Sequence, residues 1–248
     1  MPRETLLVFR HQLDLTLRSK MSIAFGAMQP VLYLVLFGPL LTGFGGALGG
    51  DSWNVLVPGL LVQLGLLSAG LAGFGIVFDA RFGVLERLRV TPVSRLALLL
   101  GRVLSSTLVL MFQAALLVGV AVALGLRAPL PGLLIGLGLL TLLAVSLAAL
   151  SPAAAITMPQ PEMFAPLMST VVVPLMLLSG AFLPMSLAPG WLDVLSRLTP
   201  FRYIADGLRA AFAGHYADGP LLWGALAAAL LSVVSLTIGT RTFLRENA

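Results

Sequence analysis

The chain has 248 residues, of which 58% are hydrophobic and only 10% are charged. Soluble domains carry charge on about 25% of their residues, so a soluble fold is excluded because too few polar side chains remain to cover its surface. The absence of cysteine excludes disulfides and thiolate metal sites, and a net charge of +5 in so apolar a chain indicates basic membrane loops rather than nucleic-acid binding.

Residues 1–21 have the pattern of an amphipathic helix that lies in the membrane interface on the cytoplasmic side. Arg10 lies on one face, four residues before Asp14 and eight before Arg18. Such a helix either docks and transmits motion or is a passive anchor, and its sequence leaves both interpretations open. The apolar face is formed by Leu6, Phe9, Leu13 and Leu17.

Six segments are long and apolar enough to span a membrane, which takes roughly 20 residues of helix. They lie near 22–42, 54–78, 96–124, 132–152, 163–183 and 220–240. The first could be a signal peptide, but its apolar run is too long and no convincing cleavage site of small residues follows it. The predicted fold class is therefore an all-α integral membrane protein, with six transmembrane helices in a single domain, 1–248.

Basic residues predict the side that each loop faces. The N-terminal segment, the 79–96 loop and the C-terminal tail are rich in arginine, whereas the 43–53 loop has no basic residue. Because Lys and Arg accumulate in cytoplasmic loops, both termini should be cytoplasmic.

Five of the fifteen basic residues lie in one short stretch, RFGVLERLRVTPVSRLALLLGR, at 81–102. Residues 79–91 have helical spacing, and Pro92 disfavours helical geometry in the residue before it, so a short helix should end there. Ser94 is then a plausible N-cap for the third span. This stretch is either a helix that contacts a partner protein or an ordinary basic loop that only sets the topology.

Residues 184–219 contain too many prolines and glycines to cross the membrane. Their pattern predicts two short helices on the outer side, partly sunk in the outer leaflet or re-entering it. Arg202, Asp206 and Arg209 are spaced for mutual ion pairs. A surface loop with no transport role is the alternative. The residues singled out in these outer helices are Trp191, Phe201, Arg202, Tyr203, Asp206 and Arg209.

The middle of the predicted spans contains no ionisable residue, and its larger polar groups are Tyr33, Gln63 and Gln113. These three are candidates for a substrate path, although small polar groups in spans more often join helices. An ion-coupled secondary transporter is disfavoured because such proteins place ionisable residues deep in their spans. No catalytic or metal constellation is visible, and a scaffold without transport remains open. The sole lysine, Lys20, follows serine, so the chain has no P-loop for ATP.

Two stretches, ERLRVTPVSRLALLLGR at 86–102 and LSGAFLPMSLAPGWLDVLSRLTPFRYIADGLR at 178–209, resemble the permease subunits of ABC type-2 exporters. The six-span layout agrees, and the resemblance is greatest to the daunorubicin-resistance-like drug and lipid branch. It implies a bacterial plasma-membrane complex of two permeases, copies or paralogues, with two copies of a separate ATPase that holds ATP and Mg²⁺. It also implies contact with membrane lipid, and re-entrant outer helices at 185–213. A coupling helix near 80–90 would contact the ATPase through Phe82, Leu85, Glu86, Arg87, Leu88 and Arg89.

The apolar interior suits an amphipathic, drug-like or lipid-like cargo, and the resemblance implies that this cargo moves out of the cell. Export of polysaccharide or lipid-linked glycan is the alternative, which the low aromatic content of 8% mildly disfavours because aromatic residues would be expected along a sugar path. The two permeases are expected to touch through their first and fifth spans, where Gly26, Gly38 and Gly180 would allow close approach.

Overall fold

The computed structural model describes residues 2–18, 26, 28–29, 31–36, 38, 52–81, 94–158, 163–181, 185 and 188–245. Every regular element within these ranges is helical, which confirms the all-α class for this part of the chain. Much of the predicted first span, 22–42, lies outside the described residues. So do the predicted coupling residues Phe82, Leu85, Glu86, Arg87, Leu88 and Arg89.

Four helical stretches among the described residues are long and apolar enough to cross a membrane: Trp53–Phe78, Leu96–Ala123, Leu130–Ile156 and Gly219–Phe243. The first is formed by α3 (Ser52–Gly70), a 3₁₀ turn η1 (Leu71–Gly73) and α4 (Phe74–Arg81). The others are α6 (Arg95–Ala123), α7 (Leu130–Ile156) and α11 (Gly219–Arg245). They match the second, third, fourth and sixth predicted spans.

The predicted fifth span, 163–183, is shorter than expected. Helix α8 (Phe164–Leu178) ends just before Gly180, whose φ of 70° is the left-handed conformation that commonly ends helices. Its apolar part, Pro166–Leu178, falls short of the roughly 20 residues of a span. The described residues therefore support four spans, and the predicted count of six is not confirmed.

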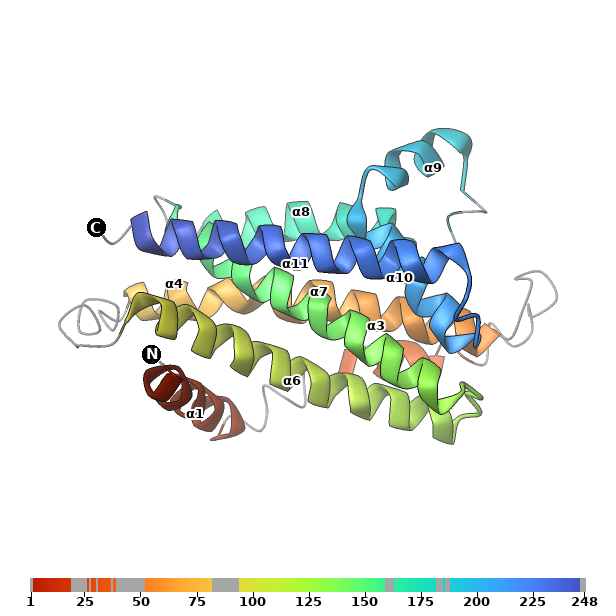
Figure 1. Cartoon of the computed structure of the whole chain (residues 1–248), viewed down its shortest axis with the longest axis horizontal. Helices are drawn as coiled ribbons and strands as arrows, with labels where there is room; N and C mark the ends of the chain where they lie inside the picture. The colour runs from red at the N-terminus through yellow and green to blue at the C-terminus, as the bar shows by residue number, and fades with distance from the viewer. Residues whose placement is uncertain are drawn as a thin grey trace.

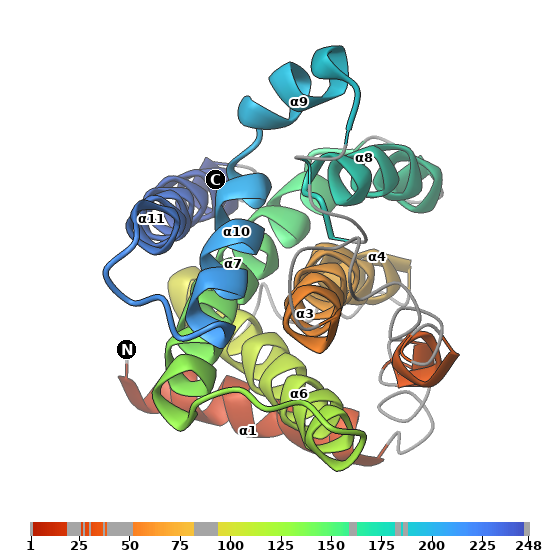
Figure 2. The same cartoon turned by 90° about the vertical axis from the view of Figure 1, so that its right-hand side faces the viewer.

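Helix α7 lies at the centre of the bundle and packs against α3, α6, α11 and α10 (Pro200–Phe212) (Figure 2). Its few polar side chains join these neighbours. Ser146 Oγ lies 3.0 Å from Ser232 Oγ of α11. Ser151 Oγ accepts a hydrogen bond from the Gly73 N–H at 2.8 Å and donates to the Gly70 carbonyl. The backbone groups freed at the break between α3 and α4 are thus satisfied inside the bundle, as a membrane requires.

The long helices run between two ends of the molecule (Figure 1). One, called here the α1 end, holds α1 (Pro2–Arg18), the last turn of α4, the first turn of α6 and the C-terminal end of α11. The other, the α9 end, holds α9 (Gly190–Arg197) and α10. This grouping agrees with the two sides predicted from the basic residues. The cytoplasmic placement of the α1 end stays a prediction.

Candidate functional site

At the α1 end, α1 lies across the first turns of α6 rather than along the bundle (Figure 2). A Cβ atom built on Gly101 of α6 would lie 2.6 Å from Val8 Cγ1 and 3.1 Å from the backbone N of Phe9. Such contacts are too short for any residue with a side chain, so glycine is what allows the two helices to cross this closely.

A hydrogen bond between distant segments also fixes α1 to α6. Glu4 Oε2 accepts a hydrogen bond from the Ser94 N–H at 3.0 Å, and this bond lowers the pKa of Glu4. Ser94 is the N-cap residue of α6, as predicted, but its hydroxyl makes no capping bond. The sequence did not reveal the role of Glu4 because the two residues are 90 positions apart.

The predicted interface residues of α1 are not on one uniformly buried face. Leu6 is more than half exposed and Arg10 is exposed, whereas Phe9 and Leu13 are half-buried. Leu17 lies within the helix. The proposed role of this face in docking or relaying motion stays a prediction.

The predicted path residues make no hydrogen bond to one another in the described part of the chain. Gln113 Oε1 accepts a hydrogen bond from Ser68 Oγ at 3.3 Å, which joins α6 to α3. Tyr33 OH accepts one from Gln29 Nε2 at 3.5 Å. Gln63 is buried, and its Oε1 has no partner among the described residues. Gln113 therefore acts as a packing contact between helices.

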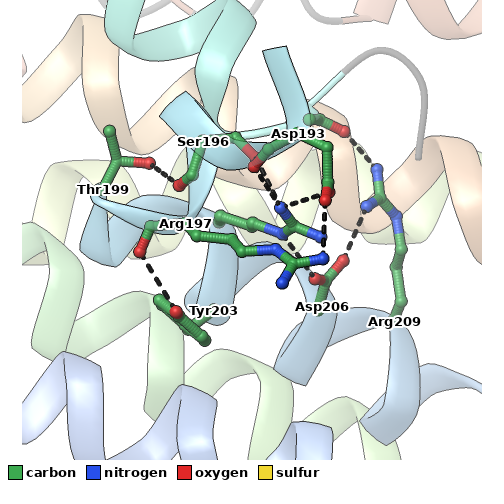
Figure 3. Close-up of polar contacts among 9 residues, drawn as sticks. Asp193, Ser196, Arg197, Thr199, Tyr203, Asp206 and Arg209 are labelled. Atoms are coloured by element: carbon green, nitrogen blue, oxygen red, sulfur yellow. Dashed lines mark hydrogen bonds and ion pairs between the residues drawn. The ribbon is translucent and has the colours of Figure 1, made fainter. Parts of the chain in front are cut away.

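At the α9 end, an ion-pair cluster ties α9 to α10 (Figure 3). Arg202 Nη1 of α10 lies 2.6 Å from Asp193 Oδ1 and 2.5 Å from Ser196 Oγ, both in α9. Hydrogen bonds from Arg202 lower the pKa of Asp193, and Arg197 acts in the same direction, while burial opposes them. The Arg202 side chain is only 16% exposed, so the ion pair between Arg202 and Asp193 lies between two packed helices and is not a solvent-exposed surface pair.

The ion pairs predicted within α10 are confirmed. Arg209 Nη1 lies 3.1 Å from Asp206 Oδ1, and Arg202 Nε lies 3.7 Å from Asp206 Oδ2. Arg209 also donates to the Gly180 carbonyl in the turn after α8. Sequence reasoning missed Asp193 and Ser196, and it missed the Gly180 carbonyl as an acceptor for Arg209. Of these only Asp193 carried a signal, its spacing of four from Arg197.

The two outer helices bury their apolar residues to different extents. In α10 the apolar side chains of one face are buried in the bundle: Phe201, Ile204, Leu208 and Phe212. Trp191 of α9 is exposed, and α9 stands away from the bundle in both views (Figures 1 and 2). Tyr203 OH donates to the Arg197 carbonyl at 3.1 Å, which adds a second link between the helices.

The contacts between α9 and α10, called here the α9 cluster, are suited to fixing the positions of helices rather than to catalysis. The cluster consists of Asp193, Ser196, Arg197, Arg202, Asp206 and Arg209. Its aspartates each contact at least one arginine, so their charges are largely satisfied within the cluster. Among the described residues, no group of three or more His, Cys, Asp or Glu side chains could hold a metal ion. The arrangement therefore fixes α9 on α10 and α10 on the end of α8.

Comparison with known proteins identifies the family. The family described as ABC-2 type transporter matches residues 3–213, a range that includes α1, α6, α9 and α10. The chain belongs to the ABC-2 type transporter family. The 86–102 and 178–209 stretches both lie within the matched range, so their resemblance is confirmed at the level of the family.

Curated relatives of this ABC-2 permease agree with the family. It is 30% identical over 191 residues to transport permease ycf38 of Pyropia yezoensis. The aligned region covers 74% of this chain and 65% of the relative. It is 27% identical over 197 residues to the Cyanophora paradoxa protein of the same name, covering 77% and 68%. It is also 27% identical over 193 residues to the daunorubicin resistance ABC transporter permease protein DrrB1 of Streptomyces coeruleorubidus, covering 75% and 67%. The matches span about two thirds of the length of these relatives.

Proposed function

We propose that this ABC-2 permease is the transmembrane subunit of an ATP-driven exporter that moves an amphipathic, drug-like or lipid-like substrate out of the cell. Two permease chains form the pathway, and two copies of a separate ATPase subunit supply the energy. Family membership is the observation that carries this proposal. The relative named for daunorubicin resistance supports a drug-like cargo.

The distribution of charge in the spans supports an external source of energy. Within the four candidate spans the charged residues are Arg102 and Arg241, and both lie within about two turns of the α1 end of their helices. Carriers driven by ion gradients place ionisable groups deep in the membrane, where they bind and release the coupling ion. The central parts of these four spans offer no such group.

Transport in inverted membrane vesicles tests the proposal. Vesicles that contain the permease together with its ATPase subunit should accumulate the fluorescent anthracycline daunorubicin when ATP is added. A protonophore should leave this accumulation unchanged, because a proton gradient is not the energy source. Accumulation that needs no ATP and disappears with the protonophore would refute the ATP-driven mechanism.

Charge reversal at Glu86 tests the coupling role that the family resemblance implies. Glu86→Arg should insert normally but fail to retain the ATPase, because like charges at a protein contact cost several kcal/mol, which is two or more orders of magnitude in affinity. Asp218→Arg is the matched control, since it reverses an exposed acidic residue at the α9 end. A pull-down that retains equal ATPase with both variants would contradict the assignment.

A further inference from the structure

A groove of about 520 Å³ lies between α1 and α6 at the α1 end. Leu6, Leu104 and Leu108 in its walls are about half exposed, so the groove is open on the outside of the bundle. It is separate from the α9 cluster and from the predicted path residues. Its walls are formed by Thr5, Leu6 and Phe9 of α1 and by Leu104, Thr107 and Leu108 of α6.

The direction of the groove matches that of a lipid chain. It begins where α1 crosses α6 and follows α6 as far as Met111, which is about 10 Å of helix beyond Leu104 at 1.5 Å per residue. Because α6 is a candidate span and α1 lies across its first turns, this path leads from the membrane interface toward the bilayer centre. An acyl chain takes the same path when its headgroup lies beside an interfacial helix.

One residue that lines the groove has a polar atom without a hydrogen-bond partner among the described residues. Thr107 is 7% exposed, and its Oγ1 is buried without a hydrogen bond in the described part of the chain. Helical threonines commonly donate to the carbonyl four residues earlier, as Thr141 does to Leu137 at 2.7 Å. A buried hydroxyl without an acceptor is unfavourable, and the ester carbonyl of a glycerolipid would supply one.

Two arginines of α1 are neighbours of Leu6, one of the groove residues, by helical spacing. Arg3 and Arg10 lie three residues before and four residues after Leu6, so both flank it on the surface of α1, and both are exposed. The carboxylate of Glu4 is already engaged by the Ser94 N–H. Arginines at this level of a membrane attract anionic headgroups.

We propose that the groove binds one acyl chain of an anionic phospholipid from the leaflet at the α1 end. Thr107 donates to an ester carbonyl of the lipid, and Arg3 and Arg10 face its phosphate. The lipid is a bound component rather than cargo, because the groove lies on the outside of the bundle and ends at Met111. Its chain fills the space between α1 and α6 and so holds the two helices together.

Native mass spectrometry of the purified, delipidated permease tests lipid binding directly. Titration with phosphatidylglycerol should fill one site more tightly than titration with phosphatidylcholine, by about fivefold for each arginine that faces the headgroup. Arg3→Gln and Arg10→Gln should each reduce this preference, whereas Arg127→Gln, at the other end of α6, should not. Equal binding of the two lipids by the wild-type protein would overturn the proposal.

Two variants locate the site. Leu104→Trp fills the groove and should weaken phosphatidylglycerol binding at least about tenfold, the loss expected when two methylene groups leave an apolar site. Leu116→Trp is the matched control, because Leu116 is an exposed leucine of α6 outside the groove. Thr107→Val keeps the shape of the side chain and should weaken lipid binding several-fold without lowering the unfolding temperature of the lipid-free protein. Unchanged binding in Thr107→Val, or equal binding in the two tryptophan variants, would refute the assignment.

Discussion

Arg202 and Arg197 make the same contact with the same carboxylate but in different surroundings, which allows a sharp comparison. Each has a guanidinium nitrogen 2.6 Å from a carboxylate oxygen of Asp193. Arg202 reaches from α10 to α9 and is 16% exposed, whereas Arg197 lies within α9 and is 63% exposed. Arg202→Ala removes the link between the helices, and Arg197→Ala removes an ion pair within one helix.

The two substitutions should differ widely in effect. Exposed ion pairs four residues apart contribute little, so Arg197→Ala should speed amide hydrogen exchange in α9 by no more than about fivefold. Arg202 also lies within hydrogen-bonding distance of the Asp193 carbonyl, at 2.9 Å, and of Ser196 Oγ, at 2.5 Å. Losing charge-assisted bonds at a poorly exposed site should speed exchange by roughly ten- to a hundredfold.

Hydrogen exchange read by mass spectrometry in detergent micelles measures this difference. Peptides from α9 report the local opening, and peptides from α7 report the bundle. Only the α9 peptides should respond to Arg202→Ala, because the Arg202 contacts lie at the α9 end. Equal acceleration by the two alanine variants would show that burial does not set the strength of these pairs. Equal acceleration of α7 and α9 would show that Arg202 stabilises the whole bundle instead.

Two further predictions rest on close packing and on protonation. A Cβ on Gly59 would lie 1.6 Å from the Ala181 carbonyl oxygen, so Gly59→Ala should destabilise the protein by at least about 1–3 kcal/mol. A Cβ on Gly138 would have nothing within 4 Å, so Gly138→Ala should be neutral or stabilising by up to about 1 kcal/mol. Thermal unfolding of the two variants measures this difference. Because the folded-state pKa of Asp193 is below the ordinary 3.8, its ion pair should persist above that pH and be lost as the pH falls below it. Trp191 emission should report this acid transition, and Asp193→Asn should remove it.

Most of the fold could be predicted from the sequence because its long apolar runs indicate membrane-spanning helices. The predicted spans 96–124, 132–152 and 220–240 lie within a few residues of α6, α7 and α11, because nothing but a helix satisfies such backbone in a membrane. The position at which α8 ends could not be predicted, since a glycine such as Gly180 suits both close helix packing and a left-handed turn. Gly180 adopts the turn. Gly26 and Gly38, also expected between permeases, lie against Gln113 and Trp53 of the same chain.

The ion pairs were predictable only where they are local. The spacing of Arg202, Asp206 and Arg209 places them on one face of a helix, and the structure confirms their contacts. The contact between Arg202 and Asp193 depends on how α9 folds back over α10, which no helical spacing encodes. The bond between Glu4 and Ser94 likewise depends on α1 crossing α6.

The two ends of the molecule are connected through α7. Helix α1 crosses α6 at Gly101, α6 packs on α7, and α7 packs on α10. The contact between α7 and α10 is especially close, because a Cβ on Gly132 would lie 2.1 Å from the Ala211 carbonyl oxygen and one on Gly136 would lie 2.6 Å from the Phe212 ring. Surfaces packed this tightly move together rather than slide past each other. A displacement of α1 should therefore reach α10, and through Arg202 it should reach α9.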